Sequence, residues 1–295
     1  MVAGILQIWS DLAFCTEHFL SPRATAFVHT FLDPELGGLP QAATYADGLK
    51  WSDPWSRKLH YVQAAPSDST DSCSYSSGRD CADGKCLLGA VQNYTQILEC
   101  ESQASPKLKS DAIAFLAHYV GDMTQPLHLC KRLNGGNGAK ATFNPRTPGR
   151  ANTNLHVIWD KMIIQKRVRE DFMRDLEGYS SHLVGLVSST TKAKEIDLIR
   201  QQYHEHDDWN IWNVAIHWAT ETNGLNCDTG IPAAHTSNCI VWEMYDQDSA
   251  QDLSGRYYQD VFETVDSLLA IAGFRIASLL NTLVESYNDD GSCVQ

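Results

Sequence analysis

The chain has 295 residues, nine cysteines and a formal net charge of −13. This length suits one large domain, and no linker rich in Pro, Ser or Gly and no run of charge divides it. No apolar run approaches the length of a membrane span. The charge excludes a protein that binds nucleic acid through its general surface, since such a surface is basic. A polyanion would need a local positive site, which bound dications can supply.

The first part of the chain mixes short helices with loops. Residues 1–20 make a poor signal peptide, because no Lys or Arg precedes their apolar stretch and Asp11 interrupts it. Ser21 and Pro22 predict a helix start, with Ser as the N-cap and Pro at the first helical position. After that helix we expect a short helix over 41–49, a loop over 51–55, a short extended or turn segment over 59–62 and a polar loop over 65–86.

The rest of the chain carries a helical period. Apolar spacing predicts helices over about 87–100, 106–123, 154–168, 170–189, 194–204, 207–223 and 255–288. Several Gly and Pro residues predict a long loop or hairpin over 133–153 and a loop over 224–250. The Gly-rich run at the start of the first loop matches no phosphate-cradling pattern, so it is interpreted as ordinary flexible loop. Because period-two alternation is almost absent, we expect an all-α fold.

The stretch from His118 to His128 has the residue types of a metal site. His118 and Asp122 are four residues apart, so they project from the same side of a helix. A proline then ends that helix, so His128 comes from another direction. His156 and Asp160 repeat the four-residue spacing. One such pair is usually a surface ion pair, but two pairs with a third imidazole are the ligands that zinc prefers.

The cysteines favour an oxidising compartment, and we expect a secreted protein. Cys81 and Cys86 are close together and flanked by Gly and Asp, as in a small disulfide loop. A glycosylation sequon at Asn93 agrees with this interpretation. The odd count leaves at least one free thiol, and we expect Cys15 and Cys130 to be free. The alternative is a cytosolic chain with reduced thiols.

Together, these motifs resemble those of the S1/P1 nuclease family over about residues 19–287. The resemblance rests on Asp47, a Leu-His-Tyr run at His60, the 118–128 stretch, Asn137 at the end of Gly-Gly-Asn, and the Asn-Leu-His-x-x-Trp-Asp run that ends at Asp160. It implies a secreted, zinc-dependent, all-helical phosphodiesterase that cuts single-stranded DNA and RNA. The implied fold is a single compact multi-helix domain of the phospholipase C/P1 nuclease type. We expect a monomer with no membrane partner, and 3′-nucleotidase activity is a further expectation.

The resemblance also implies two zinc sites and two disulfides. The ligands of the first zinc would be Asp47, His60, His118 and Asp122, and those of the second would be His128, His156 and Asp160. Asp122 would also bridge to a third zinc. The disulfides would be Cys73–Cys227 and Cys81–Cys86.

Further residues are expected to act on the substrate. Asp47 would orient the attacking water, while Lys50 would add positive charge over the scissile phosphate. Tyr61 would stack on a base, and Gln63 and Asn137 would contact the substrate. The family has an Asp at the position of Gln63, which leaves the base preference open. The alternatives are that Lys50 is a solvated surface residue and Tyr61 a packed core residue.

The N-terminus departs from the family. Mature family members begin Trp-Gly-x-x-Gly-His, and the Trp amine and the His bind the third zinc. The matching positions here hold Gly4 and Trp9, while His18 should point elsewhere. Either the first exon is misassigned, or the chain binds only two zinc ions strongly. We therefore treat 1–20 as an atypical N-terminus and 21–290 as the nuclease-like domain.

Two other functions stay open. A phospholipase C-like enzyme shares the zinc arrangement, although Tyr61 and the lack of an exposed apolar entry helix argue against it. The other is a zinc-stabilised helical protein that lost catalysis together with its N-terminal motif.

Overall fold

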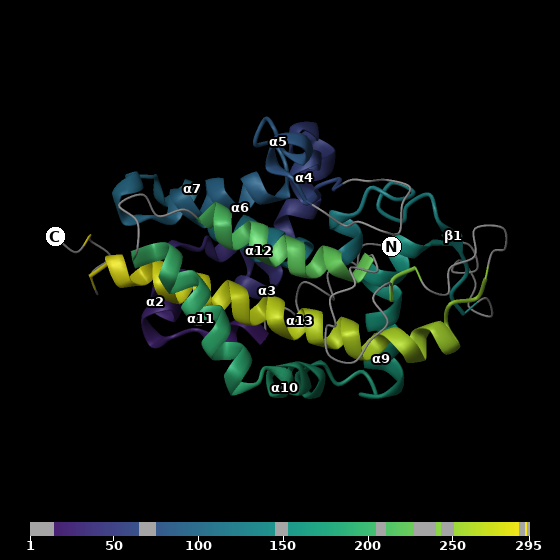
Figure 1. Cartoon of the computed structure of the whole chain (residues 1–295). Helices are drawn as coiled ribbons and strands as arrows, with labels where there is room; N and C mark the ends of the chain where they lie inside the picture. Colours follow the sequence, from purple (N-terminus) through teal and green to yellow (C-terminus); the bar gives the residue numbers. More distant parts are fainter. Residues whose placement is uncertain are drawn as a thin grey trace.

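The structure is a computed structural model, and it describes residues 15–64, 75–144, 153–204, 211–226, 240–242, 251–288 and 293 (Figure 1). Within these ranges the chain is mainly helical, and its strands form one two-stranded antiparallel pair. The expected all-α fold is therefore confirmed. Gly4, Trp9 and the expected Cys73–Cys227 disulfide lie outside the described residues.

The elements follow one another in this order. The α-helices are α2 (Pro22–Phe31), α3 (Leu39–Ala42), α4 (Tyr45–Ser52), α5 (Ser77–Asp80), α6 (Leu87–Leu98), α7 (Pro106–Thr124), α8 (Leu155–Val157), α9 (Ile163–Glu170), α10 (Leu176–Leu186), α11 (Ser189–His204), α12 (Ile211–Asn223) and α13 (Arg256–Leu283). Short 3₁₀ segments are η1 (Pro34–Leu36), η2 (Pro54–His60), η3 (Cys100–Ser102), η4 (Pro126–Leu129), η6 (Gly224–Asn226) and η7 (Val284–Ser286), and η5 (Ile158–Met162) is a π-helical turn. The strands β1 (Lys140–Ala141) and β2 (Thr153–Asn154) pair in the loop where a hairpin was expected.

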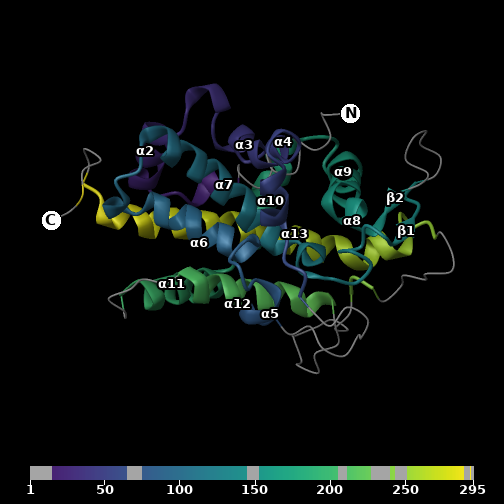
Figure 2. The ribbon, with the colours of Figure 1, turned by 90° about the horizontal axis from the view of Figure 1, so that it is seen from above.

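Helix α13 is the long axis of the molecule. It contacts α2, α7, α9, α10 and α11, and α11 and α12 lie on one side of it while α2, α3 and α7 lie on the other (Figure 2). By length and apolar content, residues Arg256–Ser286 could cross a membrane, contrary to our sequence-based expectation that no such run exists. However, 78% of that apolar window is buried inside the molecule, as in the core helix of a globular protein.

Helix α7 carries the first half of the predicted metal motif. Its start follows the expected chemistry, because the Ser105 side chain accepts a hydrogen bond from the Leu108 amide and Pro106 occupies the first turn. Almost every residue from Lys109 to Thr124 is buried, so the helix lies in the core. It ends at Gln125, and η4 then carries His128 in a new direction, as predicted.

Several predicted boundaries are wrong. The helix expected over 41–49 is two helices, α3 and α4, and the segment that follows is the 3₁₀ helix η2 rather than a loop and an extended stretch. Helix α10 begins six residues later than expected, because Met173 and Arg174 adopt left-handed φ angles of 51° and 68° that end the preceding turn.

The cysteines agree with the expectations that the described residues test. Cys81 and Cys86 form the predicted disulfide, and Cys15 and Cys130 are free thiols. A second disulfide, Cys100–Cys293, was not predicted. It joins η3, directly after α6, to the C-terminal segment across 193 residues.

Candidate metal centre

The structure brings the seven predicted metal ligands together. Four lie on α4, η2 and α7, and three lie on η4, α8 and η5: Asp47, His60, His118, Asp122, His128, His156 and Asp160. Six of them form two groups, within each of which the candidate ligand atoms all lie within 4.8 Å of one another. The first group is Asp47, His60 and His118, and the second is His128, His156 and Asp160.

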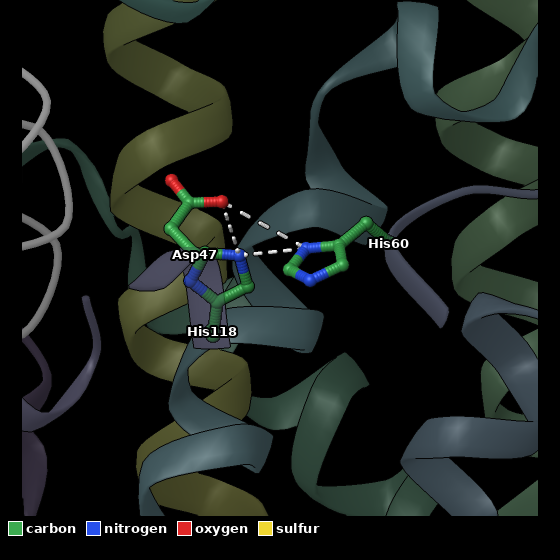
Figure 3. Close-up of side chains that lie close together, drawn as sticks. All are labelled: Asp47, His60 and His118. Atoms are coloured by element: carbon green, nitrogen blue, oxygen red, sulfur yellow. Dashed lines mark hydrogen bonds and ion pairs between the residues drawn. The ribbon is translucent and has the colours of Figure 1, made fainter. Parts of the chain in front are cut away.

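In the first group, two imidazole nitrogens and a carboxylate face one another (Figure 3). His118 Nε2 lies 3.0 Å from His60 Nδ1 and 3.6 Å from Asp47 Oδ1. His118 Nδ1 lies 2.7 Å from the Ala43 carbonyl oxygen, an acceptor, so this nitrogen carries the proton of the neutral ring. With Nδ1 protonated, Nε2 is the ring nitrogen that can bind a cation, and it faces His60 Nδ1 and Asp47 Oδ1. A cation between these atoms would satisfy all of them.

The second group is oriented in the same way. His128 Nδ1 donates to the His60 carbonyl at 2.6 Å, and His156 Nδ1 donates to the Gly135 carbonyl at 2.7 Å. Both Nε2 atoms then face Asp160, at 3.4 Å for His128 and 3.2 Å for His156. Backbone carbonyls that hold the far ring nitrogen are typical of metal-binding histidines, since they fix the tautomer that leaves Nε2 free.

Asp122 lies between the two groups. Its Oδ2 is 2.9 Å from His60 Nδ1 and 3.3 Å from His118 Nε2, while its Oδ1 is 3.5 Å from His128 Nδ1. The residue is 1% exposed, and Oδ1 has no hydrogen-bond partner in the described part of the chain. A buried carboxylate oxygen without a donor is costly unless a cation compensates its charge. This oxygen is therefore independent support for a metal site.

The pKa values reflect close pairing between the buried carboxylates and imidazoles. Burial raises the pKa of Asp122, but the charges of His118 and His128 outweigh burial and hold that pKa well below its usual range. Burial lowers the pKa of His128, but the neighbouring Asp122 and Asp160 outweigh it and raise that pKa to about 9. Burial dominates at His60, where the pKa falls to about 4. Asp122 therefore stays ionised in spite of its burial, as a carboxylate ligand to a metal must.

The Gly-rich run is part of the site rather than an ordinary flexible loop. Gly135 and Gly136 have φ angles of +61° and +75°, and a Cβ on Gly135 would lie 2.6 Å from the Leu127 carbonyl oxygen. Glycine is therefore required there, both for the left-handed backbone and for the close approach. This backbone conformation places the Gly135 carbonyl where it accepts the hydrogen bond from His156 Nδ1.

Two hollows meet at the metal ligands. The inner cavity has a volume of about 90 Å³, and its lining includes Asp47, Lys50, Asp122, Gln125, His128, His156, Asp160, Lys161, Ile164, Val265, Leu268 and Leu269. The lining of the outer cavity includes Lys50, Trp51, Arg57, His60, Tyr61, Gln63, His128, Cys130, Asn134, Asn137 and His156. Both cavities are lined by Lys50, His128 and His156. The candidate ligands therefore lie between two spaces, and one bound molecule could extend into both.

The predicted substrate residues lie in the outer cavity, apart from Lys50, which lines both. Tyr61 is 40% exposed, so it is not a packed core residue. The Gln63 amide donates to Asn134 Oδ1 at 3.4 Å, and the Asn137 amide donates to the Asn134 carbonyl at 3.1 Å. Lys50 Nζ lies 2.5 Å from Asp47 Oδ1, so this lysine is paired within the site rather than solvated.

Two residues near Asp160 belong to the site but were not predicted from the sequence. The Gln125 amide donates to Asp160 Oδ1 at 2.6 Å, and Lys161 lines the inner cavity. Both had a usable signal, because Gln125 lies inside the 118–128 motif and Lys161 directly follows Asp160. As expected, His18 lies elsewhere, in a separate hollow beside α10.

Comparisons with known proteins agree with this geometry. A family model described as S1/P1 Nuclease matches residues 12–285. Nuclease P1 of Penicillium citrinum is 29% identical over 278 residues, which cover 93% of this chain and 95% of that protein. Nuclease S1 of Aspergillus oryzae is 27% identical over 96% of this chain and 94% of its own length. Endonuclease 3 of Arabidopsis thaliana is 35% identical over 84% of this chain and 77% of its own length.

Proposed function

Because the chain belongs to the S1/P1 nuclease family, we propose that it is a zinc-dependent phosphodiesterase that cuts single-stranded DNA and RNA internally. The proposal rests mainly on Asp122, a buried carboxylate between two groups of inward-facing imidazoles, one oxygen of which accepts no hydrogen bond from the residues that the structure describes. This donor set of nitrogen and carboxylate oxygen is the one that zinc prefers.

Two zinc sites follow from the two groups. Asp47, His60, His118 and Asp122 would hold one ion, and His128, His156 and Asp160 would hold the other. The positions of the family's third-site ligands hold Gly4 and Trp9. Glycine has no side chain, and an indole N–H only donates, so neither side chain can ligate a metal. We therefore assign two strong zinc sites to this chain.

The chemistry would combine the metal with side chains of the inner cavity. Bound zinc supplies Lewis acidity to a phosphate oxygen and lowers the pKa of the attacking water. Asp47, at the edge of the first group, accepts a hydrogen bond from that water and orients it. Lys50, already paired with Asp47, donates to a non-bridging phosphate oxygen as negative charge develops in the transition state.

The outer cavity accounts for the preference for single strands. A ring that stacks on a base needs that base to have an exposed face, and Tyr61 is an exposed ring beside the ligands. Duplex DNA hides these faces inside its own stack. Gln63 and Asn137 contribute amide groups on the same wall, which can hydrogen-bond the edge of a base.

Several features support secretion and glycosylation. The disulfides Cys81–Cys86 and Cys100–Cys293 fit an oxidising compartment. Asn93 of the sequon is exposed on α6, where a glycan has room.

Hydrolysis assays test the function directly. A single-stranded oligonucleotide, its duplex and phosphatidylcholine vesicles are each incubated with the protein, with zinc and with a chelator. We expect zinc-dependent internal cleavage of the single strand well above that of the other two substrates. His118→Ala should abolish cleavage, whereas His217→Ala, at an exposed histidine of α12, should not.

Other outcomes would point to other functions. Faster turnover of phosphatidylcholine would indicate a phospholipase C-like enzyme. Bound zinc without hydrolysis of any phosphoester would indicate a zinc-stabilised protein without catalysis.

A further inference from the structure

The cations that line the two cavities form a series across the metal centre. Arg57 lines the outer cavity, Lys50 lines both, and Lys161 lines the inner cavity. The protein as a whole carries a formal charge of −13, so a polyanion is repelled by most of its surface. Any strand that crosses the centre therefore depends on local positive charge, which the bound zinc ions and this series of side chains would supply together.

Lys161 differs from Lys50 in having no polar partner among the described residues. Lys50 is paired with Asp47, but Lys161 makes no hydrogen bond or ion pair with any residue that the structure describes. Its sequence neighbour Asp160 does not pair with it, because Gln125, His128 and His156 already engage the Asp160 carboxylate. The lysine is also half-buried rather than extended into solvent.

The local backbone explains why Lys161 lines the cavity. His156, Asp160 and Ile164 are four residues apart and form one helical face, and all three line the inner cavity. Lys161 is next to that face, within the π-helical turn Ile158–Met162. Single π-helical turns inserted in helices occur often at functional sites, because they shift side chains out of regular helical register.

We propose that Lys161 binds a second backbone phosphate, adjacent to the scissile one, on the part of the strand that occupies the inner cavity. This inference rests on the proposed nuclease function and deepens it. The strand would cross the metal centre, with one base on Tyr61 in the outer cavity and the next phosphate on Lys161. Lysine binds phosphate as a point charge, so the contact would favour longer substrates without selecting bases.

The test compares substrates with one phosphate and with several. Thymidylyl-thymidine has a single phosphate, whereas a thymidine hexanucleotide has neighbouring phosphates on both sides of most bonds. Lys161→Ala should lower kcat/KM on the hexanucleotide about tenfold, mainly through KM, and leave the dinucleoside monophosphate unchanged. Lys161→Arg should retain most of the activity on the hexanucleotide.

Salt dependence gives a second readout that a purely structural role would not change. The slope of log binding constant against log salt should become shallower by about 0.7 in Lys161→Ala, as expected for one lost phosphate contact on a single strand. Binding is measured on a phosphorothioate hexanucleotide with the zinc-loaded protein. Lys58→Ala is the matched control, because this exposed lysine of η2 lines neither cavity and its loss removes the same charge.

A substrate whose flanking phosphates carry no charge gives a third test of the contact. When methylphosphonates replace the phosphates next to one cleavable bond, wild type and Lys161→Ala should cleave that bond equally. Equal losses on the one-phosphate and many-phosphate substrates, or no loss on either, would overturn the proposal while leaving the nuclease function intact. If the wild type cleaves no nucleic acid at all, the proposed function itself fails.

Discussion

Nδ1 of His60 lies 2.9 Å from Oδ2 of Asp122, although 62 residues separate them in the chain. The contact joins the end of η2 to the second half of α7, and both side chains are almost fully buried. It places the Asp122 carboxylate against the first ligand group while its other oxygen faces His128. One carboxylate therefore couples the two halves of the candidate centre.

Asp122→Asn should abolish hydrolysis and lower the bound zinc. The substitution removes the buried negative charge between the groups, so activity should fall by at least about a hundredfold. Asp160→Asn, at the edge of the second group, should have the smaller effect. Steady-state kinetics and elemental analysis after dialysis measure both effects, and wild-type turnover in Asp122→Asn would refute the coupling role.

Zinc affinity should fall as the pH falls. Burial lowers the pKa of His128, but Asp122 and Asp160 outweigh it and raise the pKa to about 9 in the metal-free protein. An imidazole must lose its extra proton to bind a metal, so below about pH 9 zinc has to displace this proton, and affinity should drop about tenfold per pH unit. Competition with a chromogenic chelator between about pH 6 and 8 checks this, and a pH-independent affinity would contradict it.

Gln125→Ala should weaken the second zinc site. The amide holds Asp160 at 2.6 Å, and loss of such a contact to a metal ligand typically costs about 10–100-fold in affinity or activity. The same side chain accepts a hydrogen bond from the Leu127 amide, so the melting temperature must be measured alongside zinc affinity. Gln96→Ala, at an exposed glutamine of α6, is the control and should change neither quantity.

Glu195→Leu should destabilise the fold without touching the site. Glu195 and Arg275 are both almost fully buried, with a 3.0 Å ion pair, and the Trp218 indole donates to the same carboxylate at 2.8 Å. Removal of Glu195 leaves the buried Arg275 guanidinium with the half-exposed Glu221 as its remaining acidic partner, and should lower the free energy of unfolding by up to about 3 kcal/mol. Urea denaturation measures the loss. The double variant with Arg275→Met should recover much of it, and equal stability of wild type and Glu195→Leu would disprove the argument.

The part of the site that depends on local spacing could be predicted from the sequence. His118 with Asp122 and His156 with Asp160 are visible because helix geometry fixes the direction of residues four apart. The Ala43 and Gly135 carbonyls that orient the histidines could not be found, since any residue has a carbonyl and only the tertiary fold selects these two.

Two other features of the structure were not predicted from the sequence, and the reasons are similar. The 3₁₀ helix η2 has no 3.6-residue apolar period, so the segment that delivers His60 was expected to be loop and extended chain. The Cys100–Cys293 disulfide joins residues 193 apart, and sequence alone gives no rule for pairing cysteines over such a distance.

Anomalous diffraction at the zinc edge, on crystals of the purified protein, tests the central claim most directly. We expect two strong peaks, one within ligand distance of His118 Nε2 and Asp122, and the other within ligand distance of Nε2 of His128 and His156. A third strong peak would contradict the assignment of two strong sites. The absence of a peak at both groups of ligands would contradict the metal centre itself.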